Sequence, residues 1–287
     1  MNTPPRQTLT KDSIVVLAST LGEDADPSEI VASNIMFVDM LFEEHLKREE
    51  VSQDALRSYH VDYFLVEYEN GGFSQFVYNT RWDEAIIGYI REGLKAMGAK
   101  RYLKAFEKGA KLVEAVGKEK LEAYLDGGYF HDEDEEEVEE PVDWDAVNEA
   151  IDKAGDNEDI AELHAAWLRK HPQLYVMQSE DDMREEARRR GAALPDRAKR
   201  IAKALADEPR YLRFIRALCK EAGQELEGLT TIDPRHAFEG EQVRAYHFIT
   251  DEGHHYMIEH DGRAIMIRGE TKEEVCSIDA PEEVVMH

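Results

Sequence analysis

Apolar positions recur at helical spacing through the first two thirds of the chain. Between residues 30 and 42 they form a wide stripe, which is typical of a centrally placed helix. Asp26-Pro27-Ser28-Glu29 precedes this stripe and predicts a helix start, because proline suits the first turn and acids face the positive end of the helix dipole. Ser52 and Asp143 are expected caps of later helices. Helices are predicted over residues 14–18, 30–42, 52–66, 85–97, 101–116, 121–125, 144–151 and 156–168.

The pattern changes in the last third of the chain. Residues 196–222 predict one amphipathic helix, which Pro209 kinks or splits. Beyond Gly228 the period approaches two, and Asp261-Gly262 is a strong hairpin-turn signal. Strands are predicted over residues 243–250, 256–258, 264–267 and 275–278.

These elements predict a mainly α N-terminal helical domain, followed by a smaller α+β C-terminal domain with an antiparallel sheet. We place the junction near Gly191, so that residues 1–190 form an acidic all-helical domain and residues 191–287 an α+β domain of unknown role. No run of about 18 apolar residues occurs, and the N-terminus lacks the layout of a secretory signal. With only two cysteines, we expect a cytoplasmic protein without disulfides.

Residues 66–79, VEYENGGFSQFVYN, interrupt an aromatic helical stripe with Asn-Gly-Gly and then restart it. Asn70 and the two glycines tolerate positive φ, so they suit a tight reversal between two helices. Phe73, Phe76 and Val77 share one helical face, while Gln75 and Asn79 point away from it. The two amides can tie down the backbone of the reversal or face a partner, and we interpret the stretch chiefly as a structural corner.

Charge is the strongest compositional signal. The chain holds 35 basic and 62 acidic residues, a net charge of −27. Residues 1–187 carry 19 Lys/Arg and 43 Asp/Glu, a net of −24. Such a surface disfavours direct nucleic-acid binding and attracts basic proteins, although acidity also serves solubility. In residues 132–140, DEDEEEVEE, eight of nine residues are acidic, which indicates an exposed loop that can also dock a basic partner.

The sequence of this corner resembles a motif of a known protein family. With its Asn-Gly-Gly-Phe, following Gln and closing aromatic-Asn pair, it resembles the nineteen-kilodalton DNA-mimic protein family, and AIIGYIREGLKAMGAKRYLKAF resembles that family's next helix pair. The likeness covers residues 30–170. It implies an all-helical fold, homodimerisation, and acids laid out like duplex phosphates to occupy a DNA-binding protein. The family-motif residues, with a structural role, are Asn70, Gly71, Gly72, Phe73, Gln75, Tyr78 and Asn79.

Signals of catalysis are weak. No nucleophile elbow, phosphate loop or dinucleotide fingerprint occurs, and nothing near Cys219 or Cys276 marks a catalytic thiolate. Histidines cluster in the last third, but their spacing fits no zinc pattern, and adjacent His254 and His255 would face opposite sides of a strand. We therefore predict no cofactor, no metal ligands and no catalytic residues. The clustered histidines are His236, His247, His254, His255 and His260.

The leading hypothesis is an interaction protein without enzymatic activity. It would occupy the DNA-binding surface of a basic protein, such as a transcription regulator or nucleoid-type protein, without binding nucleic acid or membrane itself. The alternatives are a metal-dependent enzyme that uses the C-terminal histidines, and an acidic immunity or antitoxin protein. The predicted partner-binding residues are Asp132, Glu133, Asp134, Glu135, Glu136, Glu137, Glu139 and Glu140.

Overall fold

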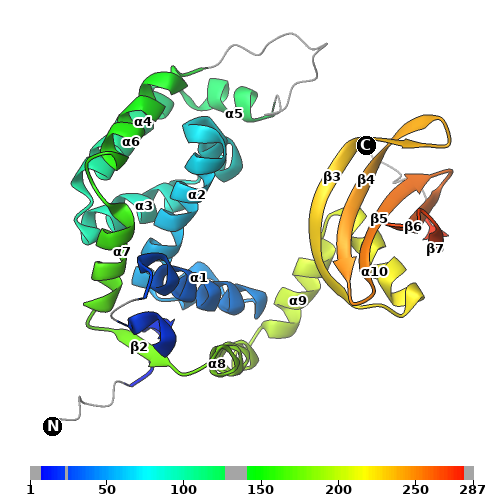
Figure 1. The fold of residues 1–287 in the computed structure, drawn as a ribbon, viewed down its shortest axis with the longest axis horizontal. Helices are drawn as coiled ribbons and strands as arrows, with labels where there is room; N and C mark the ends of the chain where they lie inside the picture. The colour runs from blue at the N-terminus through cyan, green and yellow to red at the C-terminus, as the bar shows by residue number, and fades with distance from the viewer. Residues whose placement is uncertain (1–7, 23–24, 127–140, 281–287) are drawn as a thin grey trace. The chain divides into compact units, whose positions relative to one another are not determined.

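The computed structural model describes residues 8–22, 25–126 and 141–280 (Figure 1). The chain divides into two compact units, residues 1–197 and 198–287. The first unit is mainly helical, and the second combines helix with a five-stranded antiparallel sheet. This confirms the predicted fold class.

The helices of the first unit begin and end where local sequence signals place them. The side chains of Ser52 and Asp143 accept backbone hydrogen bonds as helix caps, as predicted, and Asp26 caps the helix that was predicted to start at residues 26–29. Gly98 and Gly117 end two helices with positive φ. None of the described helices has the length and apolar character needed to span a membrane. The helices are α1 (Pro27–Glu43), α2 (Gln53–Thr80), α3 (Glu84–Met97), α4 (Lys100–Val116), α5 (Lys118–Asp126), α6 (Trp144–Gly155), α7 (Ile160–Arg169) and α8 (Glu180–Ala192).

Two hydrophobic clusters fill this unit, and α2 contributes to both. Its first turns, with Ala55 and Leu56, pack in a cluster formed largely by α1, to which residues 14–16, α7, residues 174–177 and α8 also contribute. Its later residues pack in an aromatic cluster with α3, α4 and α6, where Phe64 and Phe106 are fully buried. Figure 1 shows α4 and α6 side by side. The long helix therefore joins the two cores, and its shape decides how they are arranged.

Two short strands depart from the predicted all-helical first part. Instead of a helix near residues 14–18, the chain forms β1 (Ile14–Leu17) and the 3-10 turn η1 (Ala18–Leu21). β1 pairs in parallel with β2 (Leu174–Met177), and Ile14 lies opposite Leu174. The short β-branched run in β1 is buried along almost its whole length, which favours a strand over a helix. The partner strand lies far away in the sequence, so only the tertiary structure reveals the pairing.

The second unit begins with a split amphipathic helix. Pro209 separates α9 (Arg197–Ala206) from α10 (Arg210–Ala222), as predicted. The sheet order is β3-β4-β5-β6-β7, with every neighbouring pair antiparallel. Asp261 and Gly262 both have positive φ in the β5–β6 turn, as the hairpin signal predicted. The strands are β3 (Leu226–Phe238), β4 (Glu241–Thr250), β5 (Gly253–His260), β6 (Arg263–Arg268) and β7 (Glu274–Asp279).

Strand β3 was missed in the sequence. It is an edge strand with much of its length exposed, and its pairing with β4 slips register at three places. It also contains Pro234, which lowers strand propensity except at edges and bulges. Its hydrogen bonds to β4 hold it in the sheet despite its weak alternation.

The two faces of the sheet have different surroundings. One face carries Phe248, Met257 and Met266, which pack with Ile215 and Leu218 of α10. The opposite face has a separate apolar cluster around Tyr256, Ile258 and Ile265. Asp233, His236 and His247 lie on this second face, on β3 and β4.

Candidate functional site

The predicted acidic loop, residues 132–140, lies outside the described residues. Its eight carboxylates therefore remain a prediction as partner-binding residues. The described structure instead gives the geometry of the corner, of acids on the helices, of one pocket and of the C-terminal histidines.

The corner is a break inside α2. Gly71 and Gly72 leave the helical conformation, with φ/ψ of −162°/24° and 74°/−171°. Only Gly72 has positive φ, so Asn70 does not use its tolerance for that conformation. A Cβ on Gly72 would lie 2.9 Å from Nδ2 of Asn148, and the Phe73 backbone N–H donates to Oδ1 of the same asparagine over 2.9 Å. The corner is thus locked against α6.

The polar side chains of the motif form hydrogen bonds across the corner. Nε2 of Gln75 and Nδ2 of Asn79 both donate to Oε2 of Glu67, over 3.0 and 2.6 Å. Phe73 is fully buried, and Tyr78 packs partly buried against the same aromatic core. The two amides therefore stabilise the reversal. This geometry fits the structural role we assigned to the motif.

Acids from several elements gather near Tyr102 on α4. Burial and then the negative charges of Glu69, Glu158, Asp152 and Asp159 raise the pKa of the Tyr102 hydroxyl. The Tyr68 hydroxyl donates to Oδ1 of Asp152 over 2.6 Å, which joins α2 to α6. The acids around Tyr102 therefore come from α2, α6 and the connection that leads into α7.

Asp62 extends this group along α2. Burial and then the neighbouring Glu69 charge raise the pKa of the Asp62 carboxyl to about 6. None of these acids forms an ion pair with lysine or arginine among the described residues. We call the following set the acidic face: Asp62, Glu69, Asp152, Glu158 and Asp159.

Acids on the α3–α4 side are, in contrast, largely neutralised. Arg91 lies 2.9 Å from Glu107 and 2.8 Å from Glu114, and Arg57 lies 2.6 Å from Glu92. Each arginine offsets negative charge locally.

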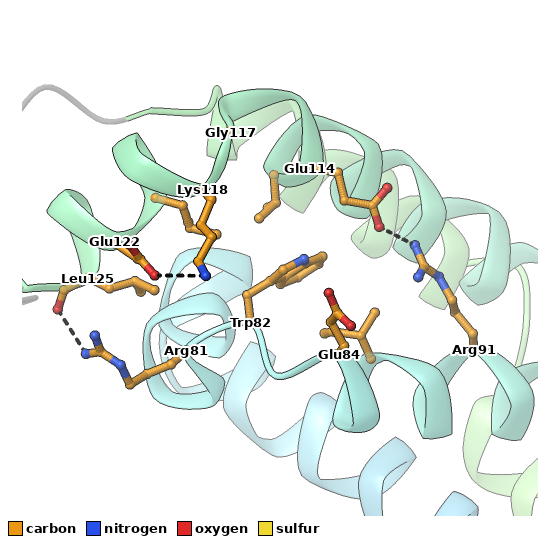
Figure 2. A pocket seen from close by; sticks show the side chains of 12 residues that line it. Arg81, Trp82, Glu84, Arg91, Glu114, Gly117, Lys118, Glu122 and Leu125 are labelled. Atoms are coloured by element: carbon orange, nitrogen blue, oxygen red, sulfur yellow. Dashed lines mark hydrogen bonds and ion pairs between the residues drawn. The ribbon is translucent and has the colours of Figure 1, made fainter.

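A pocket of about 580 Å³ opens between α3, α4 and α5. Trp82 projects into it, as Figure 2 shows. Its charges are balanced, because Lys118 pairs with Glu122 and Arg91 pairs with Glu114. A pocket with such balanced rims favours neither an anionic nor a cationic ligand, so we assign it no function.

The histidines separate between the two sheet faces. His255 is fully buried against Phe248, whereas exposed His254 stacks on His247 with ring centroids 5.2 Å apart. Adjacent His254 and His255 thus face opposite sides, as alternation predicts. Sequence reasoning missed that His236 and His247, on neighbouring strands, come together with Asp233. A histidine on each strand was visible in the sequence, but β3 itself was not recognised.

Between residues 49 and 171 the fold defines an acidic helical module built around a Gly-Gly corner. That segment, from η2 (Arg48–Glu50) to the end of α7, matches the family of DMP19-like proteins. The match confirms the resemblance to the DNA-mimic family over this segment. Comparisons with curated proteins and with solved structures give no match.

Proposed function

We propose that this protein is a DNA-mimic-like interaction protein, whose helical unit occupies the DNA-binding surface of a basic protein. The observation that carries the proposal is the acidic face, which lies wholly within the segment that matches the DMP19-like family. The match supports the class of protein, and the carboxylates of the acidic face, which have no lysine or arginine partner among the described residues, supply the chemistry that a basic surface recognises.

The charge spacing of helices supports the proposal. B-DNA presents one negative charge per about 1.7 Å of axis when both strands are counted. A helix rises about 1.5 Å per residue, so acids four residues apart on one helix are about 6 Å apart along its axis, and several such helices side by side can imitate two rows of phosphates. Glu69 on α2 and Asp152 on α6 belong to one such set from two helices. The acidic run at residues 132–140 adds negative charge, which would steer a basic partner toward this protein.

The partner class we propose is a transcription regulator or another basic DNA-binding protein. The test begins with capture of partners from the native cell at low salt and their identification by mass spectrometry. Affinity for the captured protein is then measured from about 50 to 300 mM salt, where we expect a loss of about ten-fold or more. The partner's DNA should compete with this protein for the same surface.

A charge-matched pair of variants locates the interface. Glu69→Gln, Asp152→Asn and Asp159→Asn together remove three charges from the acidic face and keep hydrogen-bond acceptors. A control removes three exposed charges from the second unit, through Glu227→Gln, Glu252→Gln and Glu270→Gln. We expect about ten-fold weaker binding for the first variant and little change for the control. Salt-independent affinity, or simultaneous binding of DNA and this protein to the partner, would overturn the proposal.

A further inference from the structure

Three side chains that can ligate a metal meet on β3 and β4, at the edge of the sheet in the second unit. Within the described part of the chain, Asp233, His236 and His247 offer ligand atoms that all lie within 4.8 Å of one another. Nδ1 of His236 lies 3.4 Å from Oδ2 of Asp233. Ligand atoms about 2.1 Å from a tetrahedral ion are themselves about 3.4 Å apart, so this pair already has the separation that a shared ion requires.

A β-bulge produces this convergence. Asp233 pairs with Ala245 and His236 with Val243, so three steps along β3 match only two steps along β4. In a regular strand, residues three apart face opposite sides. The extra residue turns Asp233 and His236 to the same side, and it is the face on which His247 lies two residues beyond Ala245. Bulges of this kind often re-aim side chains at functional sites.

A third histidine, His254, orients His247. Nε2 of His254 on β5 lies 3.1 Å from Nδ1 of His247, and the two rings are parallel within 7°. A hydrogen bond at Nδ1 leaves Nε2 of His247 available to an ion. Metal-bound histidines usually use their second ring nitrogen in this way, which fixes the ring orientation and tautomer.

The cluster rests on packed aromatic and apolar residues. Tyr256, only 3% exposed, contacts both imidazoles, with ring centroids 4.7 Å from His236 and 5.3 Å from His247. Ile258 and Ile267 continue this buried face. The packing limits the rotamers of His236 and His247, so little side-chain entropy remains to be lost on binding.

We propose that Asp233, His236 and His247 bind one divalent transition-metal ion, with His254 as a positioning residue. Two imidazoles and one carboxylate suit zinc, cobalt or nickel better than magnesium or calcium, which prefer oxygen ligands. Three protein ligands leave coordination positions open to water or another small ligand. This site is independent of the acidic face, since no residue is shared.

The test uses tag-free full-length protein stripped with a chelator. Titration with zinc chloride by calorimetry should give one ion per chain, and cobalt chloride should produce the visible absorption of a low-coordinate site. His236→Asn and His247→Phe should each weaken zinc binding by about 100-fold, because each removes a direct ligand, and phenylalanine keeps the ring contact with Tyr256. His254→Gln should weaken it by about ten-fold.

A matched control guards against nonspecific binding by histidines. His260 lies in the same sheet, close to the carboxylates of Glu239, Glu241 and Asp261, but outside the cluster. His260→Gln should therefore bind zinc as the unchanged protein does. Circular dichroism and thermal unfolding without metal show whether each variant is folded. Absence of a one-to-one zinc complex, or equal affinity in folded His236→Asn and His247→Phe variants, would overturn the site.

Discussion

The carboxylate of Glu67 accepts a hydrogen bond from Asn79 over 2.6 Å, although twelve residues separate them. A straight helix would place residues twelve apart about 18 Å from one another. The bond therefore shows that the second half of α2 folds back along the first. Gly71 and Gly72 supply the non-helical backbone for this reversal, and Glu67 stabilises it from the side.

The Glu67–Asn79 bond should be measurable as a coupling energy. A double-mutant cycle with Glu67→Ala and Asn79→Ala should give a coupling of about 1 kcal/mol, the scale of a partly exposed hydrogen bond to a charged group. Urea unfolding of the two single variants and the double variant supplies the measurement. A coupling near zero would show that the reversal is held by packing alone.

Gly72 should tolerate no side chain. Gly72→Ala combines a positive φ of 74° with a contact to Asn148, so we expect a loss of roughly 1–3 kcal/mol in the free energy of unfolding. Gly88→Ala in α3 is the matched control, because its Cβ would meet nothing within 4 Å. That change should be neutral or stabilise by up to about 1 kcal/mol. Equal effects of the two substitutions would contradict the account of the corner.

The ionised carboxylate of Asp62 should lower the free energy of unfolding at neutral pH. Burial, with Glu69 nearby, raises the pKa of Asp62 in the folded state from 3.8 to about 6. At a pH between these two pKa values, the Asp62 carboxyl keeps its proton in the folded state but has released it in the unfolded state. The contribution of Asp62 to the free energy of unfolding therefore falls as pH rises from about 4 to 6. Asp62→Asn should then gain about 1 kcal/mol at pH 7.5, with an allowance for solvent screening, and the gain should disappear near pH 4. Urea unfolding at both pH values tests this, and a gain that is independent of pH would contradict it.

His60 should contribute to acid sensitivity. It is 5% exposed, neither ring nitrogen has a hydrogen-bond partner, and it stacks on Tyr89 with centroids 5.1 Å apart. Burial, with Arg48 nearby, lowers its pKa to about 4. Below about pH 6.5 the unfolded state binds a proton that the folded state does not, so this contribution to stability is lost as pH falls from about 6.5 toward 4.

His60→Phe should remove this loss of stability at acid pH and keep the stacking on Tyr89. We expect unchanged or slightly higher stability at pH 7.5, because two buried polar atoms without partners disappear. Stability should also fall less between pH 6.5 and 4, as chemical unfolding at several pH values would reveal. An identical pH slope in both proteins would assign the acid sensitivity to other groups.

Local sequence signals determined much of this fold. Caps at Asp26, Ser52 and Asp143 and the turn at Asp261-Gly262 act within a few residues of themselves, so they were predictable. The Asn-Gly-Gly corner was recognisable for the same reason. The family match over residues 49–171 confirmed what that motif indicated.

The elements that were missed depend on distant partners. Ile14–Leu17 is a strand because it pairs with Leu174–Met177, a relation that no local window contains. β3 is a strand because of its pairing with β4, which compensates for Pro234 and for weak alternation.

The sequence by itself determined the helical periodicity, the corner and the excess of acid in residues 1–187. Only the tertiary structure decided which charges act together. It gathered Glu69, Asp152 and Asp159 around Tyr102, while Arg91 neutralised acids on α4. It also brought His236 to the sheet face of Asp233 and His247 through one extra residue in β3. Charge and ligand type belong to single residues, but binding depends on distances between side chains, and those distances are set by packing and strand register.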